Sequence, residues 1–230
     1  MDVEIWSDIA CPWCYIGKRR FEAALARFEH SGEVNVTWRS FELDPAAPAE
    51  REGERAARLA EKYGMSVEQA REMERQMTET AAGEGLEFRF DIARSGTTFD
   101  GHRLIHLAAE HGLQDAMKER LLRAYFSEGE LMSDREALVR LAGEVGLDMD
   151  EAREMLAGER FADQVRGDER MAQAFGISAV PTFVVDRKLG VSGAHPPDSL
   201  LQLLHEGWTR RDPAPVVVTG GEACDVDGNC

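Results

Sequence analysis

The chain has 230 residues, of which 43% are hydrophobic and 30% charged, and its formal net charge is −16 at pH 7. This composition is typical of a globular protein with a sizeable core. The acidic balance, without any long run of lysine or arginine, argues against nucleic acid as a partner and gives no electrostatic reason to approach an anionic membrane. No stretch approaches the roughly 20 apolar residues of a spanning helix, and the beginning lacks a signal-peptide pattern. We therefore expect a cytoplasmic protein.

The first 43 residues predict a strand, a helix and a second strand. Residues 3–7 and residues 34–38 alternate apolar and polar side chains, as half-buried strands do. Between them, apolar residues spaced four and three apart predict an amphipathic helix that begins at the sequence Cys11-Pro12-Trp13-Cys14 and ends before residues 31–32.

Residues 44–176 are predicted to be mostly helical. Ser66 with Gln69, and Ser133 with Glu136, have the spacing of capping boxes that begin helices. Four apolar stripes at helical spacing accompany them: Ala70, Met73, Met77 and Ala81; Leu113, Met117 and Leu121; Leu138, Leu141 and Val145; Phe161, Val165, Ala172 and Phe175. Such stripes are usually core, so we assign them no cofactor role.

Strand signals return after the helices. Residues 182–185 are β-branched and aromatic, residues 186–188 resemble a hairpin turn, and residues 189–191 read as a partner strand. Two prolines at 196–197 then favour the start of a helix that runs to about residue 208. The last 20 residues, 211–230, predict a tail in which a valine run can add an edge strand.

Cys11 and Cys14 have the spacing of a redox pair. Disulfide exchange needs a thiolate that attacks and a second thiol that resolves the mixed disulfide. Cys11 precedes the helix, whose backbone N–H groups and dipole favour a thiolate, and Pro12 suits its first turn. We predict that Cys11 attacks and that Cys14, expected to be the more buried thiol, resolves, with the uncharged Pro12 and Trp13 between them. The alternatives are half of a zinc site and two buried thiols without a role.

Pro181 precedes the strand at 182–185. A Cys-x-x-Cys sequence between a strand and a helix is a thioredoxin-like signature, and thioredoxin-like folds carry a proline at this place, normally after a cis bond. A cis bond before proline usually marks a site. We therefore predict that Val180 and Pro181 lie across from the cysteine pair and hold the client. The alternative is an ordinary trans proline that opens a strand.

These motifs resemble those of the DsbA-like thioredoxin family, in the FrnE-type branch that is related to 2-hydroxychromene-2-carboxylate isomerases and kappa-class glutathione transferases. The segments that carry the resemblance are residues 7–17, 41–45, 98–106 and 176–183. It implies a thioredoxin fold split by a helical domain, thiol–disulfide exchange as the activity, and a groove beside which Phe99 and His102 contact substrate. The isomerases and transferases usually have a serine at the place of Cys11, so the full pair favours dithiol exchange and leaves glutathione open as a reductant.

Cys224 and Cys230 form a second pair at the end of the chain, with the turn signal Asp227-Gly228 between them. We predict a second redox pair on the tail, which exchanges electrons with the first pair or forms a regulatory bond. Two alternatives stay open: a zinc site made by all four thiolates, and no role.

Together the patterns predict an α/β protein, a thioredoxin-like fold with a large inserted all-helical subdomain. Residues 1–43 and 177–210 would be its two halves, residues 44–176 the insertion and residues 211–230 the tail. The predicted function is thiol–disulfide oxidoreductase or isomerase activity on protein or peptide disulfides, without a bound cofactor or metal, and with glutathione or a reductase as a further partner. The alternatives are a glutathione-dependent isomerase or transferase, and a zinc-binding or holdase-type binding protein.

Overall fold

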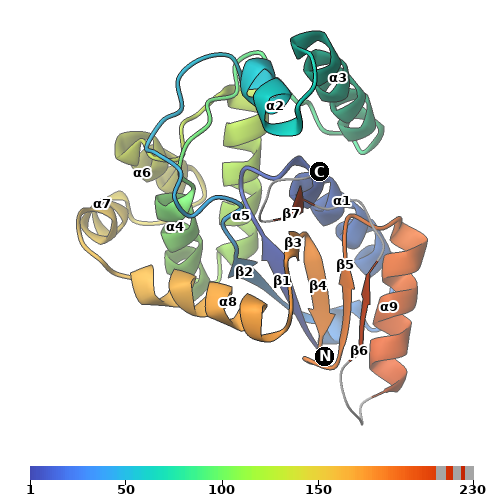
Figure 1. Ribbon diagram of the computed structural model, residues 1–230. Helices are drawn as coiled ribbons and strands as arrows, with labels where there is room; N and C mark the ends of the chain where they lie inside the picture. The colour runs from blue at the N-terminus through green and yellow to red at the C-terminus, as the bar shows by residue number, and fades with distance from the viewer. Residues whose placement is uncertain (211–215, 220–223, 226–230) are drawn as a thin grey trace.

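The structure is a computed structural model that describes residues 1–210, 216–219 and 224–225 (Figure 1). Its main sheet has five strands in the order β2-β1-β4-β5-β6. Their bounds are Asp2–Ser7 (β1), Asn35–Ser40 (β2), Thr182–Val185 (β4), Leu189–Ser192 (β5) and Val216–Thr219 (β6). Strand β1 pairs in parallel with β2 and antiparallel with β4, β5 is antiparallel to β4, and β6 is parallel to β5. The predicted strands and the edge strand in the tail are therefore confirmed.

Helices cover both faces of this sheet because successive side chains of a strand point to opposite sides. Phe183 of β4 stacks on Phe21 of α1 (Pro12–Arg27), with 5.5 Å between ring centroids. Trp6 of β1 pairs with Thr182, the residue before Phe183, so it points to the other face. There it contacts Phe175 at the end of α8 (Ala162–Ala174), at 5.7 Å. Helix α9 (Pro197–Thr209) packs beside α1.

The segment between β2 and the short strand β3 (Ala179–Val180) is helical, as predicted. Its helices before α8 are α2 (Arg55–Tyr63), α3 (Val67–Gly83), α4 (Phe99–Glu110), α5 (Gln114–Arg123), a π-helical turn (Ala124–Glu128), α6 (Arg135–Glu144) and α7 (Met149–Ala157). The α/β fold with inserted helices is confirmed, while the division at residues 43, 176 and 210 stays a prediction. Within the described residues, no helix is long and apolar enough to cross a membrane.

Helices α2 and α3 stand apart from the rest of the insertion (Figure 1). They share a small apolar cluster of their own, made by Ala56, Ala60 and Ala70, which is separate from the main core. The stripes predicted on α5 and α6 lie in that main core, where Met117, Leu121 and Leu138 are fully buried. Helix α3 also reaches the main core, where Ala81 is fully buried and Met77 packs against it, whereas the buried residues of α2 belong to the small cluster alone.

One of the two predicted capping boxes is present. Ser66 accepts a hydrogen bond from the backbone of Gln69, whose side chain accepts one from the backbone of Ser66. The box at Ser133 is wrong, because that hydroxyl donates to a backbone carbonyl of another loop. Asp134 caps α6 in its place and accepts from the backbone N–H of Glu136.

Two further boundaries differ from or extend the sequence prediction. Helix α1 ends at Arg27, and residues 31–33, expected to mark its end, form a separate 3₁₀ turn. In the tail, a second short strand, β7 (Cys224–Asp225), pairs antiparallel with β3. The hairpin turn between β4 and β5 is confirmed, with positive φ angles at Asp186 and Arg187.

Candidate active site

The two cysteines lie at the end of the loop that connects β1 to α1 and in the first turn of α1. Cys11 is the N-cap of the helix, with an extended backbone and no capping hydrogen bond from its side chain, and Pro12 is the first helical residue. The backbone N–H of Cys14 donates to the carbonyl of Cys11 at 3.1 Å. Both are free thiols with 0% exposure. The expectation that Cys14 is the more buried of the two is therefore wrong.

The buried thiol of Cys11 lies against β3. Its Sγ donates a hydrogen bond to the carbonyl of Val180 at 3.5 Å, and the peptide bond between Val180 and Pro181 is cis, as predicted. Helix α1 lies so close that a Cβ added at Gly17 would stand 2.8 Å from Cγ of Pro181. The cysteine pair and the proline are therefore brought together from opposite ends of the chain.

Asp8 forms a buried polar cluster under the loop that carries Cys11. Its carboxylate accepts hydrogen bonds from the backbone of Leu43 at 2.8 Å and the hydroxyl of Thr98 at 2.9 Å. It also lies 3.3 Å from Nε2 of His102. Burial raises the pKa of Asp8, but the contacts with His102, Leu43 and Thr98 outweigh burial and hold it below its usual value. Asp8 is therefore a fixed negative charge at the base of the site.

Lys118 is a second buried charge near the pair. It comes from α5, is 1% exposed, and donates to the carbonyl of Ser7 at 3.2 Å. Its ammonium group also lies 5.6 Å from the centre of the Trp38 ring. Burial lowers the pKa of Lys118 to about 8, although the negative charge available on Cys14 and that on Asp8 oppose this effect. A lysine held in this way can stabilise a thiolate without being exposed to solvent.

The two thiols differ in their electrostatic surroundings. Burial, the hydrogen bond with Cys14 and the charge on Cys14 raise the pKa of the Cys11 thiol. Burial also raises the pKa of Cys14, but the hydrogen bond from Cys11 and the cation of Lys118 lower it overall. The sequence placed the favoured thiolate on Cys11 because of the helix N-terminus. The structure adds Lys118, whose cation lowers the pKa of Cys14, to the helix N-terminus beside Cys11.

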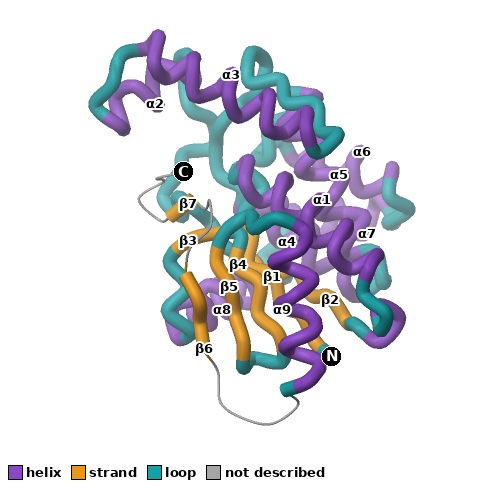
Figure 2. The backbone as a smooth tube through the Cα atoms, turned by 90° about the vertical axis from the view of Figure 1, so that its right-hand side faces the viewer, coloured by secondary structure: helices purple, strands orange, loops and turns teal. Residues whose placement is uncertain are grey.

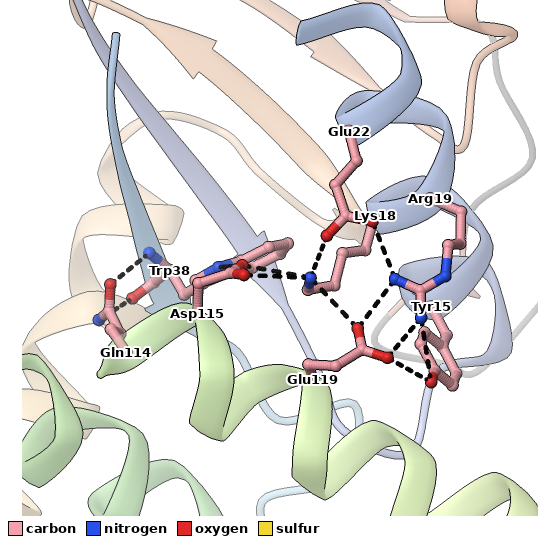
Figure 3. A network of polar contacts seen from close by, with 8 residues as sticks. All are labelled: Tyr15, Lys18, Arg19, Glu22, Trp38, Gln114, Asp115 and Glu119. Carbon is pink, nitrogen blue, oxygen red and sulfur yellow. Dashed lines mark hydrogen bonds and ion pairs between the residues drawn. The ribbon is translucent and has the colours of Figure 1, made fainter. Parts of the chain in front are cut away.

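A polar network joins α1 to α5, the helix that also carries Lys118 (Figure 3). Lys18, one turn after Cys14, is 1% exposed and pairs with Glu22, with Asp115 at 3.2 Å and with Glu119 at 3.2 Å. Glu119 also accepts a hydrogen bond from the hydroxyl of Tyr15 at 2.7 Å. These contacts join neighbouring turns of both helices. They therefore fix the position of α5 along α1.

The remaining predicted site residues occupy different surroundings. Trp13 is 7% exposed, and its indole N–H has no hydrogen-bond partner among the described residues. Phe99 is half-buried under the guanidinium of Arg166, 4.5 Å from the ring centre. His102 is 1% exposed against Asp8, so its predicted contact with substrate stays a prediction.

The tail pair is described only in part. The backbone of Cys224 pairs with Val180 through β7 and β3, and Cys230 lies outside the described residues. The predicted second redox pair therefore stays a prediction. Among the described residues, no group of three or more His, Cys, Asp or Glu side chains could hold a metal ion.

A cavity of about 390 Å³ opens beside the loop of the pair. Its wall on the redox side includes Asp8, Ala10 and Pro12, and its opposite wall is formed by α2 and the segment before it. A substrate that reaches the pair from this side would pass between the active-site loop and α2.

Sequence reasoning missed Lys118 and the partnership of Asp8 with His102. The one local signal for Lys118 is its place four residues before Leu122, since both side chains lie on the buried side of α5. Asp8 and His102 lie 94 residues apart in the chain, so only the packing of α4 against the first loop brings them together.

The family of the chain follows from these features and from comparison with known proteins. Residues 2–205 match the family described as the DsbA-like thioredoxin domain. The chain belongs to this family. A probable DsbA oxidoreductase from Streptomyces coelicolor is 47% identical and has a TM-score of 0.88, with 99% of this chain and 97% of the other covered. The family predicted from the sequence is therefore confirmed.

More distant relatives share the fold. YwbO from Bacillus subtilis is 27% identical over 80% of this chain and 86% of its own length. The cytosolic disulfide reductase DsbM from Pseudomonas aeruginosa, solved with GSH, is 19% identical and has a TM-score of 0.64, with 91% of this chain and all of that chain covered. A 2-hydroxychromene-2-carboxylate isomerase is 14% identical with a TM-score of 0.62, over 91% and 95% of the two chains. These two structures show the fold alone.

Proposed function

We propose that the protein exchanges thiols and disulfides with protein or peptide clients through Cys11 and Cys14. One observation carries the proposal: the Cys11 thiol, at the start of α1, contacts the backbone carbonyl of Val180 directly before cis Pro181. A client strand that pairs with β3 would bring its own sulfur to the same place. Membership of an oxidoreductase family supports this chemistry.

The exchange proceeds in two displacements. The proton of Cys11 first passes to the Cys14 thiolate across the hydrogen bond between them. The Cys11 thiolate then attacks one sulfur of the client disulfide, a bond between Cys11 and that sulfur forms, and the client S–S bond breaks. The other client sulfur leaves as a thiolate and takes the proton back from Cys14. Cys14 then attacks the sulfur of Cys11, so the client leaves reduced and the pair becomes a disulfide. Two electrons pass from the pair to the client, and a thiol of the glutathione class or a dithiol reductase returns them. Each step is reversible.

The buried charges support this sequence of steps. Lys118 stabilises the thiolate of Cys14, and Cys14 is the group that must attack in the second displacement. Val180 and Pro181 hold the client, Pro12 and Trp13 form the loop that it meets, and Phe99 contacts it from α4. His102 contributes indirectly by fixing Asp8. Cys224 and Cys230 form a second pair that exchanges electrons with the first.

The test is a redox titration of the full-length protein in graded glutathione buffers, followed by Trp13 fluorescence. We expect a two-electron transition that is lost in Cys11→Ser and in Cys14→Ser. Absence of any transition while the thiols remain titratable would refute dithiol exchange. Catalysis that needs glutathione and survives Cys14→Ser would indicate a glutathione-dependent isomerase or transferase instead. A matched Cys230→Ser variant reports whether the tail shifts the midpoint.

A further inference from the structure

Helix α2 carries a row of basic residues that line the same cavity as Pro12 of the loop with the cysteines. Arg55, Arg58 and Lys62 are spaced three and four residues apart, which places them on one face of the helix. With Arg51 they line the cavity that Pro12 borders on its other side. The whole chain has 43 acidic and only 27 basic residues. Asp8, Asp44 and Glu61 line the same cavity, so its four basic side chains exceed its acidic ones by one, in a chain whose net charge is −16.

Part of this positive charge is available to a ligand. Arg51 pairs with Asp44, and Arg55 pairs with Glu74 at 2.8 Å. Arg58 instead donates only to neutral oxygens, which are two backbone carbonyls at 2.9 and 2.5 Å and a serine hydroxyl at 3.0 Å. Lys62, one turn further along α2, is exposed. Within the described residues, Arg58 forms no ion pair with a carboxylate, and Glu74 acts on it only through space.

The chain's own strand β7 pairs with β3, the strand whose Val180 contacts Cys11. In β7 the backbone of Cys224 pairs with Val180, and that of Asp225 pairs with Ala179. Both views place β7 at the end of the sheet that faces α2 and α3 (Figures 1 and 2). The tail around this cysteine reads Gly-Glu-Ala-Cys-Asp-Val-Asp over residues 221–227, so acidic residues flank the cysteine on both sides.

We propose that the site selects acidic, cysteine-bearing peptide segments. The client backbone pairs with the edge of β3, its reacting sulfur meets Cys11, and a flanking carboxylate binds Arg58 and Lys62. The tail of this chain is one such segment and competes with external clients for the edge. This inference rests on the proposed thiol–disulfide exchange and adds the class of client.

A peptide fits these features better than a small anionic thiol does. Main-chain pairing with a sheet edge needs an extended backbone and supplies affinity without reading the sequence. Charge complementarity then supplies selectivity and a faster association. The combination of a pairing edge at β3, which β7 of the tail occupies in this structure, and a cationic face on α2 provides both contributions, whereas a small thiol would use the cations alone.

The test compares two peptides as symmetrical disulfides. One has the sequence of residues 220–228, Gly-Gly-Glu-Ala-Cys-Asp-Val-Asp-Gly, and the other has lysine at its three acidic positions. The rate at which the reduced, full-length protein cleaves each is measured at low and high salt. We expect the acidic peptide to react about three- to tenfold faster at low salt, because rim charges act mainly on association.

Variants then locate the selectivity. Arg58→Glu combined with Lys62→Glu should abolish or reverse the preference for the acidic peptide. Arg75→Glu is the matched control, since Arg75 lies on the neighbouring α3, is 65% exposed and pairs with Glu72. This control should keep the preference of the wild type.

The outcomes separate this inference from the proposed function. Equal rates for both peptides in the wild type, or an unchanged preference in the double variant, would overturn the client class while leaving exchange intact. Failure to cleave either peptide or the neutral hydroxyethyl disulfide would overturn the proposed function itself. If the double variant slows oxidised glutathione but not the acidic peptide, the cations serve a small thiol and the peptide proposal is wrong.

Discussion

Replacement of Lys118 by methionine tests whether the buried cation sets the reactivity of the pair. Methionine keeps the length of the side chain and removes its charge. We expect two effects: the oxidised protein becomes more stable at pH 7, because a buried charge is gone, and the pKa of Cys14 rises in the reduced protein, because its nearby cation is gone.

The magnitude follows from the pKa of Lys118, which burial lowers from 10.5 to about 8. One pKa unit corresponds to about 1.4 kcal/mol, so holding the protonated amine in the fold costs roughly 3 kcal/mol at pH 7. The folded value lies below the unfolded one, so the cost is complete below pH 8 and disappears as the pH rises from 8 to 10.5. Loss of the hydrogen bond from Lys118 to Ser7 lowers the free energy of unfolding by about 1 kcal/mol. The pKa of about 8 includes the charges of the two thiols, so it applies to the reduced protein, whose net gain in free energy of unfolding is about 2 kcal/mol.

The oxidised protein gains more than this, because its disulfide carries no negative charge that favours the Lys118 cation. Each 1.4 kcal/mol of difference between the two redox forms shifts the potential by about 30 mV, here toward more negative values. Urea denaturation of the oxidised protein at pH 7 and pH 10, and a redox titration, measure both effects. Lys62→Met, the same change at an exposed position, is the control. An oxidised Lys118→Met protein that is less stable than wild type, or a difference that persists at pH 10, would refute the reasoning.

Three further changes probe the surroundings of the site. Gly17→Ala should displace Pro181, with a loss of about 1–3 kcal/mol in free energy of unfolding and slower thiol–disulfide exchange. The control is Gly167→Ala, where an added Cβ has space. Denaturation curves and exchange rates measure both variants. Arg103→Met should cost about 3 kcal/mol or more, since the buried Arg103 donates to three backbone carbonyls in α7 and the loop after it, and thermal unfolding would show it. Burial lowers the pKa of His102, so the free energy of unfolding should fall below pH 6.5, and denaturation of His102→Gln across pH 5–8 should lack this dependence.

Local patterns in the sequence predict most of the fold. Period-two alternation located β1 and β2, and the box at Ser66 located the start of α3, because each signal depends on neighbours in the chain. The box at Ser133 failed because its hydroxyl found a partner in a distant loop, which no local pattern contains. The strand β7 was not predicted for the same reason, since its pairing with β3 is a tertiary contact.

The candidate site divides in the same way. Cys11, Cys14 and Pro181 carry signals of their own, in a two-residue spacing and a proline before a strand. Lys118 carries almost none, because a lysine on a helix is normally solvated and its burial is decided by the helix packed above it. The assignment of attack to Cys11 stays a prediction, and the structure adds a group on which the sequence is silent. The helix N-terminus visible in the sequence favours Cys11, whereas burial of Cys11 and the hidden cation favour Cys14.

The chemistry of the pair therefore depends on how the insertion docks. The thiols come from the first 43 residues, but two of the groups that set the charge below them, His102 and Lys118, come from α4 and α5. The network of Lys18 with Asp115 and Glu119 fixes α5 against the helix of the thiols, so the redox centre has its electrostatics only when the two parts are assembled (Figure 3). The helix with the cationic face, α2, is by contrast outside the main core and joined to it by few apolar contacts. The insertion thus combines helices packed into the main core beside the cysteines with a helix, α2, whose buried apolar residues lie in a separate cluster.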